Sequence, residues 1–402
     1  MLHQIISRLF RAQHHWRSVS FDEIAELYVS RLLTVFAVNI VSTFAVIYLY
    51  LLGYSVLFIA TFFGLGFLFR AFFSIPAAQY AAFFGPKHGI LLANVLRIPA
   101  LVAFALVPQY GLSAVIAFGL FQYTSNTLYD LCYMIDFSKV RSIGHTGKEL
   151  GTMQVMDKIA KVLGPLAGGI VASYYGPQVA ILIACGLFIG AAVPLFRTVE
   201  PTILRRRLHI NGFPWRLAWR SLCSEVAIGF DVSTRGLAWS LWLGVFIFAA
   251  LGSGVYVALG GLASLGVLVS MLAAWTFGVM IDRNKGHILL SVGTIVSSIV
   301  HLFRPFITAP AGVVAANIAN ETAASAYEMP FMRVMFDVAD SSGFRITYLM
   351  LIEIALNSGA ALACGVIVAA LLVFEPKAAL QLLFIVAAGV ELLLLFSRRQ
   401  AK

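Results

Sequence analysis

Long apolar stretches follow one another along almost the whole chain, and this feature limits the possible folds more than any other. A bilayer core about 30 Å thick is crossed by a helix of about 20 apolar residues. We therefore expect twelve spans, at residues 31–52, 55–83, 89–108, 111–134, 150–174, 178–196, 236–259, 262–281, 288–308, 310–331, 346–373 and 377–396. Of the 402 residues, 60% are hydrophobic and only 11% are charged, which excludes an ordinary soluble domain. The sequence predicts an all-α polytopic membrane protein.

The distribution of lysine and arginine predicts the orientation. With both termini in the cytoplasm, the short outer connections carry only Arg304 and Lys377 of the 28 basic residues. Four others, Arg70, Arg97, Lys158 and Lys161, fall within spans, and the rest lie at or near the cytoplasmic side. This bias indicates an integral protein of the plasma (inner) membrane with cytoplasmic N- and C-termini.

The longest hydrophilic stretch divides the chain into two halves of six helices. We expect a cytoplasmic lead-in at 1–30, an N-terminal half at 31–196, a cytoplasmic central loop at 197–235, a C-terminal half at 236–396 and a cytoplasmic tail at 397–402. Within the loop, apolar residues from Trp215 to Val226 alternate with charged ones, which predicts an amphipathic helix on the inner leaflet. The turn between the seventh and eighth spans is expected at Gly260-Gly261, in preference to Gly252-Ser253-Gly254.

The two halves contain matching residues, which indicates a duplicated six-helix unit. Tyr129-Asp130 recurs as Tyr327-Glu328, and Asp157 recurs as Glu353 at nearly the same offset. Equivalent charges are therefore expected at equivalent depths in spans four and ten, and again in spans five and eleven.

A short motif directly follows the eighth span. It consists of Gly278, Asp282 and Arg283, followed by Lys285-Gly286-His287. Together with the two six-helix halves and the long central loop, this motif resembles the one found after spans two and eight in the major facilitator superfamily of secondary transporters. The resemblance covers nearly the whole chain and implies that family's fold and alternating access. It also implies a latch between the halves through the Asp, although the first-half copy has Ala82 at the matching place.

Small residues mark the fifth span. Gly164-Pro165 and Gly168-Gly169, with Gly151 and Ala160, resemble the span-five glycine motif of the same superfamily. Small residues let helices approach closely, and a proline lets a helix bend. In that family the motif is associated with exporters that exchange substrate for protons, so the resemblance implies export. The Arg that the family carries in span four is absent here, which weakens the transfer of its proton-antiport mechanism.

Ionisable residues within the spans are costly, so each requires a role. Arg70 lies in the middle of span two and is interpreted either as a counter-ion for an anionic substrate or a coupling carboxylate, or as a structural salt bridge. Asp157 and Lys161 are four residues apart and therefore share a helix face, where they could form an ion pair. Glu353 and Asn357 repeat that spacing without the lysine. Glu353 is then expected to carry a proton or to pair with Arg70 or Lys158.

A polar cavity wall is expected on span ten, where Asn317, Glu321 and Glu328 share one face. Asn126 and Asp130 of span four would join this wall, with hydrogen bonding between helices as the alternative role for the neutral side chains. Glu391, near the inner end of span twelve, is expected to extend to the interface without a role in transport.

The function expected from these features is secondary active transport of a small molecule by alternating access, coupled to protons or another ion. A symporter or facilitator for sugars or other nutrients is the alternative within transport, and a non-transporting receptor or assembly subunit is the alternative outside it. Gly144-His145-Thr146-Gly147-Lys148 lacks the spacing of a phosphate-binding loop, and enzyme motifs are missing. We expect no cofactor, no metal and no nucleic-acid partner despite the net charge of +10. A monomer in the lipid bilayer is favoured.

Overall fold

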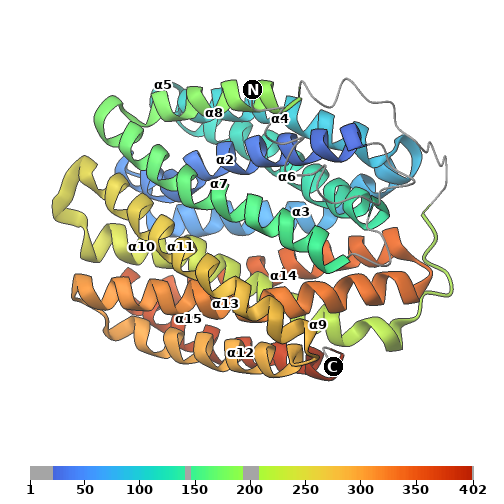
Figure 1. The fold of residues 1–402 in the computed structure, drawn as a ribbon. Helices are drawn as coiled ribbons and strands as arrows, with labels where there is room; N and C mark the ends of the chain where they lie inside the picture. The colour runs from blue at the N-terminus through green and yellow to red at the C-terminus, as the bar shows by residue number, and fades with distance from the viewer. Residues whose placement is uncertain (1–20, 141–145, 193–207, 401–402) are drawn as a thin grey trace.

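The computed structural model describes residues 21–140, 146–192 and 208–400, and these residues form helices joined by short turns, with no strand among them (Figure 1). The expected lead-in up to residue 20, the first part of the central loop with the run Arg205-Arg206-Arg207, and residues 401–402 lie outside the described residues.

The N-terminal half contains six long helices. These are α2 (Phe21–Leu51), α3 (Val56–Phe84), α4 (Pro86–Ala105), α6 (Leu112–Val140), α7 (Thr146–Tyr175) and α8 (Pro177–Ala192), with the single turn α5 (Val107–Tyr110) between α4 and α6. They lie together in the upper part of Figure 1. The expected spans match these helices to within four residues at each end, except that α2 begins ten residues earlier and α6 ends six residues later.

The C-terminal half also contains six spans, of which the first is assembled from four pieces. That span consists of α9 (Trp215–Ser233), the π-helical turn η2 (Thr234–Ala238), α10 (Trp239–Trp242) and the π-helical turn η3 (Leu243–Ile247). After the 3₁₀ segment η4 (Ala249–Gly254) come α11 (Val255–Asp282), α12 (Gly286–Phe303), η5 (Arg304–Phe306), α13 (Pro310–Ser342), α14 (Arg345–Leu371), α15 (Pro376–Glu391) and η6 (Leu392–Arg399).

Seven helices in the described part of the chain are long and apolar enough to cross a membrane: α2, α3, α4, α11, α12, α14 and α15. Four further helices, α6, α7, α9 and α13, each contain at least three charged residues. Together with α2, which carries Arg31, these four helices supply much of the site described below.

Two expectations about the seventh span are wrong. The turn that follows it lies at Gly252, whose positive φ of 54° ends the span, while Gly260 lies inside α11. A Cβ at Gly260 would overlap the carbonyl oxygen of Pro165, so this glycine permits a close approach of α7 and α11. Gly260 therefore marks a close contact between two helices and not a turn.

The second error concerns the expected central loop. Residues from Trp215 onward form α9 inside the bundle, where Ser221, Glu225 and Ile228 are buried while Trp215 and Trp219 are exposed. The predicted amphipathic helix is therefore present, but its buried side packs against α14 and η6. The alternation of apolar and charged residues fits a span with one polar inner side as well as it fits a helix on the bilayer surface.

The two halves meet mainly through two helix pairs, α7 with α11 and α3 with α14. At one end of the bundle Phe44 packs edge-on against Tyr256, with ring centroids 5.6 Å apart. At the end where the described chain begins, Phe137 packs against Phe336, also at 5.6 Å. The halves are thus in contact at both ends.

Candidate functional site

A cavity of about 260 Å³ lies between the halves. Residues from α2, α6, α9, α13 and α14 form its wall: Arg31, Asp130, Leu131, Tyr133, Met134, Glu225, Ile228, Glu328, Phe331, Met332, Met335, Leu349, Ile352, Glu353 and Leu356. Among the residues expected at a site, Asp130, Glu328 and Glu353 therefore lie in one wall.

Arg70 joins the two halves. Its Nη2 donates to Oδ2 of Asp130 in the same half, at 2.8 Å, and to Oε1 of Glu353 in the opposite half, at 2.7 Å. Nδ2 of Asn357 donates to the same Glu353 oxygen at 2.8 Å. Of the two pairing partners that the sequence left open for Glu353, the structure brings Arg70 into contact with it.

Asp157 does not pair with Lys161, and that expectation is wrong. The Asp157 carboxylate accepts two hydrogen bonds from Arg31, from Nε at 3.0 Å and from Nη2 at 2.7 Å. This bidentate pairing from α2 is stronger than a lysine contact along one helix, and Lys161 is exposed. The Arg31 guanidinium also lies over the ring of Tyr133, 4.2 Å from its centroid.

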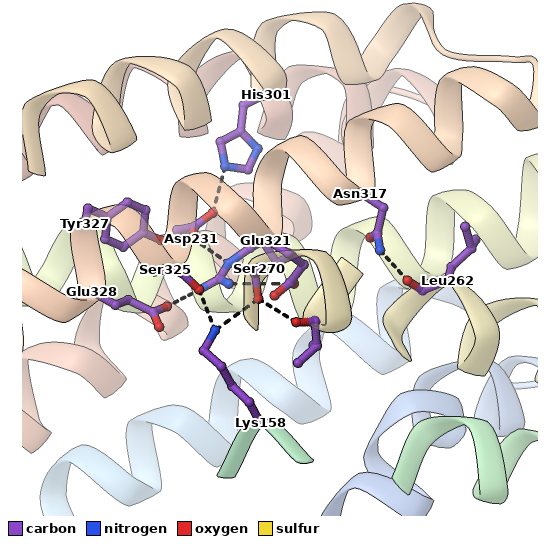
Figure 2. A network of polar contacts seen from close by, with 12 residues as sticks. Lys158, Asp231, Leu262, Ser270, His301, Asn317, Glu321, Ser325, Tyr327 and Glu328 are labelled. Atoms are coloured by element: carbon purple, nitrogen blue, oxygen red, sulfur yellow. Dashed lines mark hydrogen bonds and ion pairs between the residues drawn. The ribbon is translucent and has the colours of Figure 1, made fainter. Parts of the chain in front are cut away.

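Lys158 reaches across the interface between the halves. Its ammonium donates to Oγ of Ser270 on α11 at 3.0 Å and to Oγ of Ser325 on α13 at 2.8 Å (Figure 2). Lys158 is buried. The α7 helix therefore contributes one charged contact to its own half, through Asp157, and one to the opposite half.

Arg235 connects the cavity to the interior of the C-terminal half. It lies in the π-helical turn η2, where it forms an ion pair with Asp231. Its Nη2 also donates to Oε1 of Glu328 at 2.9 Å, and its Nη1 lies 3.9 Å from Oε1 of Glu321. Figure 2 shows these carboxylates converging from α9 and α13. The expected wall on span ten is thus organised by an arginine of span seven.

Behind Arg235 lies a fully buried cluster of Asp231, His301 and Glu391. Nε2 of His301 is 2.7 Å from Oδ1 of Asp231 and 3.1 Å from Oε2 of Glu391, and the Tyr327 hydroxyl donates to Asp231. The expectation that Glu391 extends to the interface is wrong, because only 1% of its side chain is exposed. The neighbouring His301 holds it inside the bundle.

The same three side chains are the one group in the described residues whose ligand atoms are close enough to hold a metal ion. However, Nη1 of Arg304 lies 3.1 Å from Nδ1 of His301. An arginine can only donate, so Nδ1 accepts and the ring proton lies on Nε2, between the carboxylates. The arrangement fits a hydrogen-bonded cluster better than a metal site, since a metal would have to replace that proton. Arg304 lies in η5, in the connection between α12 and α13 where it was expected, but its side chain is buried.

The remaining expected residues lie away from the cavity wall. Asn126 accepts from Gln122 at 3.1 Å and from Arg97 at 3.4 Å, and Asn317 donates to the carbonyl oxygen of Leu262 at 2.7 Å. Both side chains thus hydrogen-bond between or along helices, which was the alternative role for them.

The motif after the eighth span lies at the surface. Asp282 and Arg283 are exposed, and no ion pair or hydrogen bond joins Asp282 to another described residue. A Cβ at Gly278 would meet no atom within 4 Å. Within the described part of the chain, Asp282 therefore forms no latch of the kind that the family resemblance implies.

Glycines of the fifth span lie at close helix contacts. A Cβ at Gly164 would lie 2.8 Å from Cβ of Asn39, and one at Gly168 would overlap the backbone of Ile40, both on α2. A Cβ at Gly169 would lie 2.5 Å from the carbonyl oxygen of Tyr256 in the opposite half. Pro165 is buried between these glycines inside α7.

Sequence reasoning missed Arg31, Glu225, Asp231, Arg235 and His301 as site residues. The first four were assigned to the edge of a span or to the central loop, where charged residues need no explanation. The amphipathic pattern from Trp215 onward is the signal that could have extended span seven. It would have placed Glu225, Asp231 and Arg235 inside the bundle.

Comparisons with known proteins agree on the fold. No family model and no curated protein matches the sequence. Among solved structures, a mutant of the peptide transporter POT matches with a TM-score of 0.69 at 12% identity, over 94% of each chain. A bacterial homologue of the iron transporter ferroportin, in its outward-facing state with soaked iron, matches with a TM-score of 0.69 at 12% identity, over 95% of this chain and 99% of that one. The chain is an integral membrane protein with the major facilitator fold.

Proposed function

We propose that this chain, which has the major facilitator fold, is a secondary active transporter of a small molecule that works by alternating access. The observation that carries the proposal is the position of Arg70, which binds a carboxylate of its own half and one of the opposite half beside the cavity. Two solved transporters of the same fold, named above for peptides and iron, support transport in general.

The Arg70 bridge suggests how an ion gradient could be coupled to movement. When the halves rock apart at this interface, the contact between Arg70 and Glu353 must break, whereas Arg70 keeps Asp130 within its own half. Glu353 is buried, and a buried carboxylate without a partner is costly. It would then gain stability by taking up a proton. Protons are therefore the proposed coupling ion, with Glu321 and Glu328 beside Arg235 as further candidates.

Export is the proposed direction, and it rests on the span-five glycine pattern alone. The proposed location is the plasma (inner) membrane with cytoplasmic termini, as the distribution of lysine and arginine indicates, and the proposed assembly is a monomer. The alternatives remain a nutrient symporter or facilitator and a non-transporting receptor or assembly subunit.

The direction of proton movement separates these functions. The purified protein is placed in liposomes that contain the pH dye pyranine, and single compounds from a panel of amines, sugars, peptides and carboxylates are added outside. For an antiporter, entry of the substrate drives protons out, so the internal pH rises. For a symporter the internal pH falls, and for a facilitator the compound enters without a pH change. Protein that moves no compound under any imposed gradient would contradict transport.

Two variants test the coupling residues. Glu353→Gln and Glu321→Gln keep the size and hydrogen bonding of the side chain but cannot ionise. We expect each to abolish substrate-driven proton movement, while downhill exchange of the radiolabelled substrate continues. Glu375→Gln, at an exposed position before α15, is the matched control and should leave both measurements unchanged. Normal proton movement in both the Glu353→Gln and the Glu321→Gln protein would exclude these carboxylates from coupling.

A further inference from the structure

Glu225 is a buried carboxylate without a countercharge. It comes from α9, lines the cavity and is 7% exposed. Its Oε2 is buried and accepts no hydrogen bond, and no ion pair or hydrogen bond joins the side chain to any described residue. Burial of an ionised group without a partner is costly. Without an occupant the Glu225 carboxyl is therefore expected to hold a proton, and a positive group bound beside it would take the place of that proton.

The other carboxylates of the wall are already paired. Asp130 and Glu353 share Arg70, and Glu328 contacts Arg235. The single basic residue of the wall is Arg31, and Asp157 engages it with two hydrogen bonds. None of the guanidinium groups of Arg31, Arg70 and Arg235 contacts Glu225.

The charges around the cavity do not balance. The wall and its direct partners contain five carboxylates, those of Asp130, Asp157, Glu225, Glu328 and Glu353, against three guanidinium groups, those of Arg31, Arg70 and Arg235. Arg235 is in addition shared with Asp231. The carboxyl groups outnumber the guanidinium groups even when Glu225 holds a proton, which disfavours an anionic occupant and favours a cation.

The rest of the wall is apolar and adaptable. Met134, Met332 and Met335 line the cavity together with the ring of Phe331 and that of Tyr133, one face of which Arg31 already covers. Methionine adapts to irregular apolar ligands, and aromatic rings attract methylated or aryl-bearing cations. A hydrated inorganic cation such as Ca²⁺ would instead require oxygen ligands on most sides. The wall therefore fits an organic cation whose body is apolar.

The backbone around Glu225 is held firmly in place. A Cβ at Gly229 would overlap the carbonyl oxygen of Leu356, and a Cβ at Gly359 would overlap that of Val226. These two contacts bring α9 and α14 close together one turn beyond Glu225. The carboxylate is thus positioned by packed helices and not by a loop, as a selective site requires.

We propose that the cavity binds an organic cation with an apolar body, and that the carboxylate of Glu225 is the residue that anchors the positive group. This inference rests on the transport function proposed above, since it names the class of molecule that the same cavity takes. The cation would occupy the space between Glu225 and the methionine and aromatic side chains, and it would supply the positive charge that the site lacks.

Binding to the intact protein in detergent tests the inference without any transport. Benzyltrimethylammonium is the cationic probe, and benzyl alcohol and benzenesulfonate are its neutral and anionic counterparts. Isothermal titration calorimetry should detect the cation at least tenfold more tightly than either counterpart. Equal or tighter binding of the anion or of the neutral compound would overturn the proposal, and this comparison needs only the native chain.

Variants then assign the anchor. Glu225→Gln should weaken binding of the cation at least tenfold, Glu225→Asp should keep most of it, and Glu375→Gln outside the cavity should match the native chain. Unchanged binding in a folded Glu225→Gln protein would overturn the role of Glu225. If that variant does not fold, Ile228→Lys places an ammonium on the same face of α9 and should also abolish binding; retained binding would overturn the proposal.

The outcome is separable from that of the proposed function. Binding of the cation that depends on Glu225, in a protein that moves no compound into liposomes, would leave this inference standing and contradict transport. Transport of an anion or a sugar by a protein that does not bind the cation would support transport and overturn this inference.

Discussion

At the scale of single residues, arginine organises the charged interior of this protein. A guanidinium has five N–H donors and can serve two carboxylates at once. Arg70 does so with Asp130 and Glu353, and Arg235 does so with Asp231 and Glu328. Each arginine thus joins side chains from different helices, so the loss of one arginine leaves more than one carboxylate unpaired.

The first prediction concerns Arg70. Arg70→Gln removes the positive charge between two carboxylates, of which Glu353 has only 9% of its side chain exposed. Removing one partner of a buried pair typically costs 3–5 kcal/mol, so we expect the free energy of unfolding to fall by about 3 kcal/mol. Adding Glu353→Gln in the same chain should restore part of that loss, because the unpaired charge is removed as well. Denaturant unfolding in detergent, followed by circular dichroism, measures both.

An exposed pair provides the control. Nε of Arg333 lies 3.9 Å from Asp337, and both side chains are more than half exposed. Exposed pairs contribute little, so Arg333→Gln should change the free energy of unfolding by no more than about 0.5 kcal/mol. A double variant at Arg70 and Glu353 that is less stable than Arg70→Gln alone would contradict the pairing.

The sequence predicted the charged positions of this site better than their partners. Arg70, Asp130, Glu328 and Glu353 stood out because ionisable residues within apolar spans are rare. Their partners depend on which helices are neighbours, and the spacing of residues along one chain does not show this. Asp157 was therefore paired along its own helix with Lys161, although Arg31 comes from another helix. Glu225 was overlooked because its helix was placed outside the membrane.

At the scale of elements, the two halves use small residues in equivalent places. Gly164 and Gly168 of α7 lie against α2, which is the contact of span five with span one. Gly359 of α14 lies against Val226 of α9, which is the contact of span eleven with span seven. The contact of the fifth helix with the first in one half, and that of the eleventh with the seventh in the other, are thus both made through glycines.

The second prediction concerns the contact of α7 with α2. Gly168→Ala adds a methyl group where the backbone of Ile40 already lies. Overpacking of this kind typically costs 1–3 kcal/mol, so we expect the melting temperature in detergent to fall. Gly186→Ala, on α8 at a position with no neighbour within 4 Å, is the matched control and should leave stability unchanged or slightly higher, because alanine favours the helix. Equal effects of the two changes would show that Gly168 is not closely packed.

Helix boundaries were predicted well where a glycine or proline turn follows an uninterrupted apolar run, as at Gly53 and Gly85. They failed at span seven, where two candidate glycine pairs competed. The positive φ at Gly252 identifies the turn. The sequence alone does not distinguish it, because a glycine is also favoured where two helices touch, as at Gly260. The π-helical turns at Thr234–Ala238 and Leu243–Ile247 have no sequence signal that we can identify.

At the scale of the whole molecule, the cavity lies between two zones of contact. Phe44 and Tyr256 join the halves at one end, while Phe137 and Phe336 join them at the end where the described chain begins. At this second end, Nη1 of Arg345 also donates to the carbonyl oxygen of Ser138 across the halves, at 3.2 Å. In the proposed alternating-access cycle, one zone would open at a time, so that the cavity becomes accessible from a single side.

The last prediction concerns that second zone. Arg345 makes two contacts, one to Ser138 in the opposite half and one to Asp340 in its own half, whose Oδ1 is 2.6 Å away. Arg345→Gln removes both and should favour opening at this end. Backbone amides near the end of α6 and the start of α14 should then exchange with solvent at least threefold faster in hydrogen-exchange mass spectrometry, because exchange reports local opening.

Asp340→Asn separates the two contacts of Arg345. It weakens the pair within the C-terminal half but leaves the donor that reaches Ser138 in place. Exchange near the end of α6 should therefore remain close to that of the native chain in this variant. If both variants accelerate exchange equally, the effect comes from the start of α14 alone, and the contact between the halves does not hold this end closed. If only Arg345→Gln accelerates exchange, the hydrogen bond to Ser138 helps to hold this end closed. That variant should then also bind the cationic probe with a faster on-rate.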